Sequence, residues 1–143
     1  TIDNQSNNLL IKASEYLSIS SISNGKSIPS EVIKFLLKNK VNINLTNIEG
    51  QTALMILCKT VFRDGIDWVI ELLENGADVG SIDKNGYTVL MYTALNTENG
   101  VALEIAKMLH DFGDVKISYI NNDEQSAVEN NNENLVNWLL TKI

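Results

Sequence analysis

The sequence predicts an all-α protein, a solenoid of about four stacked helix-turn-helix repeats. Three observations lead to this prediction. Residues of matching chemistry recur every 36 positions, apolar residues inside each unit recur at three- and four-residue steps, and polar turn residues separate the units. We place the approximate units at residues 1–44, 45–80, 81–116 and 117–143. The two outer units depart from the pattern, and we expect them to act as caps of one domain.

The 36-residue period is clearest in Leu37, Leu73 and Leu109. Six further series follow the same step: Ile33, Val69 and Ile105; Asn42, Asp78 and Asp114; Ile43, Val79 and Val115; Gly50 and Gly86; Thr52 and Thr88; Leu54 and Leu90. One coincidence would mean little. Seven aligned series of similar chemistry indicate an internal repeat.

Each unit is predicted to hold two helices. The first helix follows Thr52 or Thr88, whose hydroxyl can cap a helix N-terminus. The second covers roughly Ile66–Asn75 and Val101–Phe112, where the apolar residues form one helical stripe. The segment Ser30–Lys38 shows the same stripe, through Val32, Ile33, Phe35, Leu36 and Leu37.

The two ends of the chain contain shorter or less regular versions of the unit. Residues Asn7–Leu17 are predicted to form an opening first helix, and the polar stretch Ser18–Ser30 a long loop after it. Near the other end, Gln125–Val128 stands where a first helix would start. One helical turn is missing after it, before a second helix that contains Leu135, Val136, Leu139 and Leu140.

These residues resemble the ankyrin repeats. The family motif runs roughly D-x-x-G-x-T-P-L-x-x-A, then V-x-x-L-L-x-x-G-A-D. Residues Asp83–Leu90 are similar to the first part, with Val89 where proline is usual, and Val69–Asp78 matches the second part. The resemblance covers about Glu31–Asp114 and implies an ankyrin-type solenoid.

Two departures from the family pattern concern the connections. The family period is about 33 residues, so the extra residues are expected between paired helices, around Val61–Asp64 and Thr97–Gly100. The glycine that ends the second helix, Gly76, is replaced by Lys40 and Phe112 in the neighbouring units. We therefore expect those reversals to lack the left-handed glycine cap, unless Gly113 supplies it one residue later.

Composition argues against several classes of partner. The chain carries 18 acidic and 11 basic residues, a net charge of −7, and no Lys/Arg cluster of the kind that binds nucleic acid. No apolar run approaches the ~18–20 residues of a membrane span. The single cysteine, Cys58, excludes an internal disulfide and suits an intracellular, cytoplasmic setting. Because the chain starts at Thr1 and not at methionine, we expect it to belong to a longer polypeptide.

Catalysis is not expected from these residues. His110 is the only histidine and has no indicated nucleophile beside it, and Cys58 ends an apolar helical stripe, where a free cysteine packs as a small apolar residue. One His and one Cys are too few for a usual structural zinc site. The glycines form no phosphate-binding loop. We therefore predict no enzyme activity, no metal and no cofactor.

The ankyrin resemblance implies that partners dock on a concave face, formed by the hairpin tips and the exposed side of each first helix. On this sequence, that implies a protein-binding set of Ile48, Glu49, Gln51, Lys59, Lys84, Asn85, Tyr87, Met91 and Tyr92, with Met55 and Leu95 as further candidates on the exposed side of the first helices. Ile48 is the most informative of them, because an isoleucine in a turn buries poorly without a partner. For Met55, Met91, Trp68 and Trp138, core packing and partner contact remain open alternatives.

The predicted function is therefore that of a monomeric protein-interaction module that binds another protein in trans. The alternative is a regulatory segment that packs in cis on another domain of a larger parent protein. The sequence does not identify the partner.

Overall fold

In the computed structural model, the described residues are 4–17, 28–98, 100–118, 127 and 132–143. Within them the chain is helical and forms no strand, which confirms the predicted all-α class. The α-helices are α1 (Asn4–Leu17), α2 (Ile28–Lys38), α3 (Ala53–Thr60), α4 (Ile66–Glu74), α5 (Val89–Ala94), α6 (Val101–Phe112) and α7 (Glu133–Leu140). A single 3₁₀ turn, η1 (Arg63–Gly65), precedes α4.

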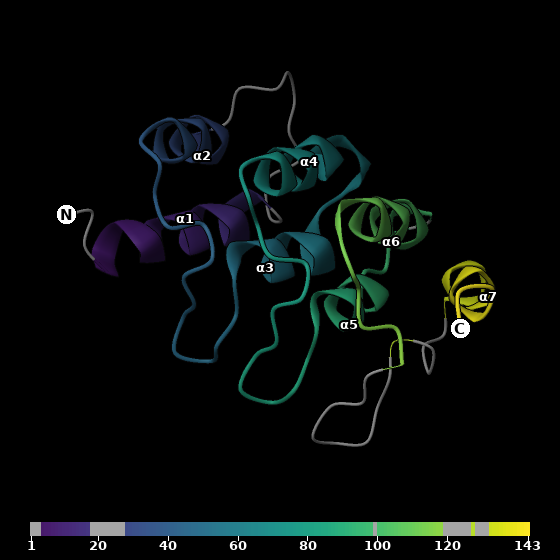
Figure 1. Cartoon of the computed structure of the whole chain (residues 1–143). Helices are drawn as coiled ribbons and strands as arrows, with labels where there is room; N and C mark the ends of the chain where they lie inside the picture. Colours follow the sequence, from purple (N-terminus) through teal and green to yellow (C-terminus); the bar gives the residue numbers. More distant parts are fainter. Residues whose placement is uncertain (1–3, 18–27, 99, 119–126, 128–131) are drawn as a thin grey trace.

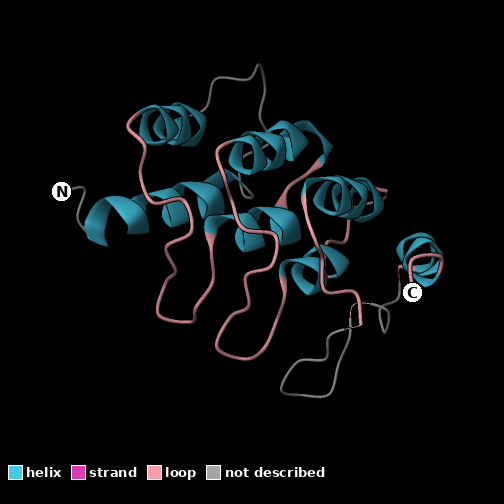
Figure 2. Ribbon diagram, viewed as in Figure 1, coloured by secondary structure: helices cyan, strands magenta, loops and turns pink. Residues whose placement is uncertain are grey.

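The helices lie in two layers. Helices α1, α3 and α5 form one layer, while α2, α4 and α6 form the other, with α7 against α6 at the far end (Figure 1). Each first helix packs on the second helix of its own unit and on the first helix of the next unit. The connections from α2 to α3 and from α4 to α5 project from the first-helix layer as two hairpins (Figure 2). We call them hairpin A (residues 40–52) and hairpin B (residues 76–88).

The first helices start where their threonines predict. Thr52 and Thr88 both have extended backbone, and each side-chain oxygen accepts a hydrogen bond from the backbone N–H three residues later, at Met55 and Met91. This bond satisfies a donor that the helix itself cannot pair. The two N-caps explain why helices as short as α3 and α5 begin at equivalent positions, 36 residues apart.

The apolar stripes form the core between the layers. Leu54, Leu57, Leu72, Ile105 and Leu109 are all at most 1% exposed. The stripe predicted for Ser30–Lys38 is correct for Ile33 and Leu36, which are buried. It is wrong for Phe35, which is 65% exposed. Residues 33 and 36 share one face of α2, and Phe35 lies outside that face.

The chain reversals after α2 and α6 lack the left-handed glycine cap, as predicted. Gly76 is left-handed, with φ 93°, and Lys40 adopts φ 53° at the equivalent position although it carries a side chain. The reversal after α2 is therefore left-handed without glycine. The predicted substitution by Gly113 is wrong, because Gly113 has an extended φ of 178°.

The end units agree with the sequence where the structure describes them. Helix α1 contains the predicted segment Asn7–Leu17 and begins three residues earlier. Helix α7 is capped by Asn132, whose side chain accepts from the backbone of Leu135. Leu135 and Leu139 are buried, whereas Leu140 is 55% exposed. Most of the predicted loop Ser18–Ser30 and of the segment Gln125–Val128 lies outside the described residues.

Candidate protein-binding surface

The tip of hairpin A is organised by one asparagine. The Asn47 side-chain oxygen accepts hydrogen bonds from the backbone N–H groups of Glu49 and Gln51, both at 3.0 Å. The Asn47 backbone also pairs with the Gln51 carbonyl and with the Gly50 N–H, again at 3.0 Å. Asparagine favours such local side-chain-to-backbone bonds in turns. Residues 47–51, which we call tip A, therefore hold a defined turn.

The tip of hairpin B is built the same way around an aspartate. The Asp83 carboxylate accepts from the backbone N–H groups of Asn85 and Tyr87, each at 2.8 Å. The Gly86 N–H donates to the Asp83 carbonyl at 3.1 Å, and Asp83 is only 7% exposed. Residues 83–87, called tip B below, thus repeat the construction of tip A 36 residues later.

Three hydrogen bonds join the two tips. The Lys84 N–H donates to the Glu49 carbonyl at 3.1 Å. The Tyr92 hydroxyl, from α5, donates to the second carboxylate oxygen of Asp83 at 2.6 Å, and the Gln51 amide donates to that same hydroxyl at 2.8 Å. Tyr92 thereby connects its own hairpin to the preceding one.

The bases of the hairpins are also tied together. The Asn44 amide nitrogen donates to the Gly76 carbonyl at 3.0 Å, and its oxygen accepts from the Asp78 N–H at 2.8 Å. One side chain of hairpin A therefore pairs with both a donor and an acceptor of the hairpin B backbone. The two hairpins are connected at the base and at the tip.

The Tyr92 phenol is held in its neutral form. Burial raises the pKa of Tyr92 to about 12, and its hydrogen bond to Asp83 adds to the increase. The ring lies against Tyr87, with centroids 5.6 Å apart at 47°. At neutral pH the hydroxyl is consequently a hydrogen-bond donor to the carboxylate.

The exposed candidates lie at the tips and on α3. Ile48 is 81% exposed, and Glu49, Lys84, Asn85 and Lys59 are exposed as well. These five side chains can meet a partner without any rearrangement of the fold. Ile48 is the unusual member, because it is a large apolar side chain left in water on an ordered turn.

The other four candidates contribute differently. Gln51 and Tyr87 are half-buried. Met91 and Tyr92 are 4% and 6% exposed, so they support the surface and offer a partner almost no area. Tyr92 can be buried because its hydroxyl is hydrogen-bonded to two polar side chains, those of Gln51 and Asp83.

Met55, Trp68 and Trp138, for which the sequence allowed either core packing or partner contact, pack within the protein. Met55 is fully buried and Trp68 is 8% exposed, with the Lys34 ammonium 5.5 Å from its ring centroid. Trp138 is partly buried and meets His110 edge-on, at 5.7 Å between ring centroids. Both tryptophans therefore contribute to packing around the second helices.

Sequence reasoning missed one apolar contribution to the surface, Phe62, and expected another, Leu95. Phe62 and Leu95 are 49% and 40% exposed and belong to the loops that follow α3 and α5. A groove of about 340 Å³ lies there, lined by Lys59, Thr60, Val61, Phe62, Leu95, Asn96, Thr97 and Glu98. The repeat pattern does not identify Phe62, because it lies in an inserted loop.

Of the residues considered for chemistry, Cys58 is buried and His110 is exposed. Burial raises the pKa of the Cys58 thiol to about 12, which leaves it protonated and a poor nucleophile at neutral pH. His110 is exposed, with its nearest acidic oxygen, that of Asp111, at 3.8 Å. In the described part of the chain, no three His, Cys, Asp or Glu side chains gather as a metal site would require.

Paired helices joined to projecting hairpins, stacked at a fixed period, define a helical repeat protein. A family model for ankyrin repeats in three copies matches residues 19–119, and the chain belongs to this family. Ankyrin repeats are generally protein–protein interaction modules. No described helix has the length and apolar character that crossing a membrane would take.

Among curated proteins, the chain is similar to the ankyrin repeat protein OPG189 of Variola virus and to that of its isolate Human/India/Ind3/1967. Each is 28% identical over 130 residues, an alignment that spans 78% of this chain and 22% of the viral protein. The chain therefore spans less than a quarter of the length of these relatives.

Proposed function

We propose that this chain binds another protein through tips A and B together with the adjoining exposed side of the first helices, and that it catalyses no reaction. The observation that carries the proposal is Ile48, an 81% exposed isoleucine on a turn fixed by hydrogen bonds. An apolar side chain on a rigid turn loses little entropy when a partner covers it. Its burial can therefore contribute directly to affinity.

The polar neighbours of Ile48 supply specificity in this proposal. Glu49, Lys84 and Asn85 are exposed on the same two tips and offer a partner a negative charge, a positive charge and an amide. Protein interfaces typically combine an apolar centre with such polar and charged residues. The single buried cysteine suits a reducing compartment, so we place the interaction in the cytoplasm.

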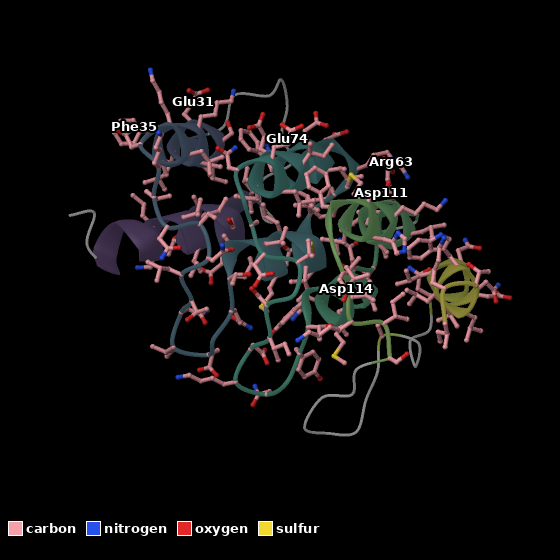
Figure 3. The ribbon with its side chains drawn as sticks, in the orientation of Figure 1. Glu31, Phe35, Arg63, Glu74, Asp111 and Asp114 are labelled. Carbon is pink, nitrogen blue, oxygen red and sulfur yellow. The ribbon has the colours of Figure 1, made fainter. Side chains whose placement is uncertain are left out.

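The test compares two exposed apolar residues on opposite sides of the molecule. Figure 3 shows Phe35 on α2, in the second-helix layer and away from the hairpins. We expect Ile48→Asp to weaken binding of a captured partner by about tenfold or more, since a buried apolar anchor is replaced by a charge. The matched control Phe35→Asp, at a residue that is 65% exposed, should leave binding unchanged.

The partner is captured by a photo-reactive amino acid placed at position 49 and identified after cross-linking in a lysate. Both aspartate variants are then titrated against the purified partner. A partner that is lost with Phe35→Asp and retained with Ile48→Asp would move the interface to the second-helix layer and contradict the proposal.

A second candidate function is docking in cis on another domain of a larger parent protein. The relatives favour it, because this chain covers only 22% of their length. The same photo-reactive residue in the full-length protein distinguishes the two functions. A cross-link within one polypeptide supports docking in cis, whereas a cross-link to a second polypeptide supports binding in trans.

A further inference from the structure

We propose that the Tyr92 hydroxyl is a positioning group, which holds tips A and B as one rigid surface. This inference rests on the proposed function for its consequence in binding. Its structural part stands on the contacts of four side chains: Tyr92, Asp83, Gln51 and Asn47.

The Tyr92 hydroxyl both donates a hydrogen bond and accepts one. A phenol has one proton to donate, which goes to the Asp83 carboxylate, and it accepts the Gln51 amide proton on its oxygen. Gln51 in turn accepts from the Asn47 amide at 2.9 Å. The chain of bonds therefore runs from the residue that organises tip B to the residue that organises tip A.

Water is largely excluded from the Tyr92–Asp83 hydrogen bond, which lies at the centre of this network. Tyr92 and Asp83 are 6% and 7% exposed, and the Tyr87 ring covers one side of Tyr92. A hydrogen bond to a buried carboxylate is stronger than one between neutral exposed groups. Losing the hydroxyl would leave both Asp83 and Gln51 short of a partner that water cannot readily replace.

The hydroxyl of Tyr92 does not recur along the repeat. The residues 36 positions before and after Tyr92 are Ile56 and Val128, and neither has a polar side chain. The tie between tips A and B is therefore an addition to the repeating pattern of the sequence.

The consequence is preorganisation of the binding surface. With the tie in place, the side chains of Ile48 and Glu49 on tip A keep a fixed distance from Lys84 and Asn85 on tip B. A partner that spans both tips does not have to order them when it binds. The partner chemistry that fits is a protein surface with an apolar pocket for Ile48 and, beside it, an acidic group for Lys84.

The experiment is amide hydrogen exchange by NMR on three variants of the chain. We expect Tyr92→Phe to lower the protection factors of the Lys84 and Tyr87 amides by about three- to tenfold, which corresponds to one lost hydrogen bond. Gln51→Met removes the amide donor between the hairpins without adding a charge that could compete with Asp83 for the Tyr92 proton. It should therefore lower protection at Lys84 while Tyr87, which bonds to Asp83, keeps its protection.

The control is Asn85→Ala, which changes an exposed side chain of tip B and should change no protection factor. The amides of α6, such as that of Leu109, are the reference in every variant. Unchanged protection at Lys84 in both Tyr92→Phe and Gln51→Met would overturn the positioning role. So would an equal loss in α6, because that would show a general loss of stability.

The exchange measurement needs no partner, so it can fail independently of the proposed function. Once a partner is in hand, Tyr92→Phe should weaken its binding by a similar three- to tenfold factor. Ile48→Asp should weaken binding without any change in amide protection. A partner that is indifferent to Ile48→Asp contradicts the proposed function and leaves the positioning role standing on its exchange data.

Discussion

The helix layers and the hairpins of this protein are held together by different interactions. Between the layers, fully buried apolar side chains such as Leu57 and Leu72 pack against neighbouring helices. Between the hairpins, the Asn44 and Gln51 amides donate across to the next repeat, where Tyr92, which accepts from Gln51, donates to Asp83. Apolar burial is strong and weakly directional, whereas a hydrogen bond contributes about 1 kcal/mol and fixes a geometry. The helix layers thus supply most of the stability, and the hydrogen bonds between the hairpins fix the position of tip A relative to tip B.

The largest expected effect is in the layers. Leu73 is 5% exposed in α4, and Leu73→Ala should lower the free energy of unfolding by about 2–5 kcal/mol, from lost burial and the remaining cavity. Urea denaturation followed by circular dichroism measures it. The control is Leu95→Ala, at a residue that is 40% exposed, for which we expect a loss below about 1 kcal/mol. Equal losses at both positions would contradict the division between core and surface.

A smaller loss of unfolding free energy is expected when buried side-chain hydrogen bonds between repeats are removed. The Asn96 amide donates to the carbonyls of Cys58 and Val61 at 3.1 and 3.0 Å, and Asn96 is 4% exposed. Asn96→Ala leaves these carbonyls unpaired and should lower the unfolding free energy by about 1–3 kcal/mol. Asn44→Ala is the exposed counterpart, at which water can replace the lost bonds. We expect it to cost under about 1 kcal/mol in the same urea titration, and a larger cost than that of Asn96→Ala would reverse our interpretation.

The sequence predicted the layers well because they repeat. Period and helical spacing identified the leucine series, and Thr52 and Thr88 identified both first-helix starts. The polar ties could not be found that way, because the period does not identify them. In one direction the residues 36 positions from Asn44 and Asn96 are Gly80 and Thr60, which lack the side-chain amide. In the other direction they are Asn8 and Asn132, and Asn132 caps helix α7.

The candidate surface was predictable only in part, for a related reason. Turn chemistry placed Ile48 and Lys84 at exposed tips. Tyr92 was expected on the surface because the ankyrin resemblance implies binding on the exposed side of the first helix, yet its hydroxyl is bound by Asp83 and Gln51. Those partners come from two different hairpins, so only the three-dimensional arrangement shows that the ring is buried.

As pH rises, the stability that depends on the buried Cys58 thiol in α3 should be lost before the stability that depends on Tyr92. The Cys58 pKa is about 12 in the folded protein and 9.0 when unperturbed, because burial disfavours the thiolate. Above pH 9 the unfolded thiol loses its proton while the folded one keeps it. Stability is therefore complete below pH 9 and falls as pH rises, by roughly 1.4 kcal/mol per pH unit, until about pH 12.

The corresponding loss for Tyr92 begins one unit higher, because its unperturbed pKa is 10.0. Urea titrations at pH 8, 9, 10 and 10.5 measure both losses. Cys58→Ala should remove the decline between pH 9 and 10, and Tyr92→Phe should reduce only the decline above pH 10. A decline between pH 9 and 10 that persists in Cys58→Ala would exclude the buried thiol as its cause.

The smallest expected difference is between alanine substitutions at two glycines, Gly50 and Gly76, since only at Gly50 would a Cβ lie against the neighbouring hairpin. Gly50 and Gly76 both have positive φ, 80° and 93°, so alanine at either position should cost about 1 kcal/mol for backbone strain alone. A Cβ at Gly76 would meet nothing within 4 Å, whereas a Cβ at Gly50 would lie 2.9 Å from the Lys84 backbone nitrogen.

Gly50→Ala should therefore cost roughly 1 kcal/mol more than Gly76→Ala, since the two tips must separate to admit the methyl group. The urea midpoint gives this difference, and amide exchange at Lys84 shows where it arises. Equal costs with unchanged Lys84 protection would mean that the tips already move apart freely. In that case the hydrogen bonds between them could not fix the placement of Ile48 relative to tip B, and the hairpins would differ from the layers in exposure alone.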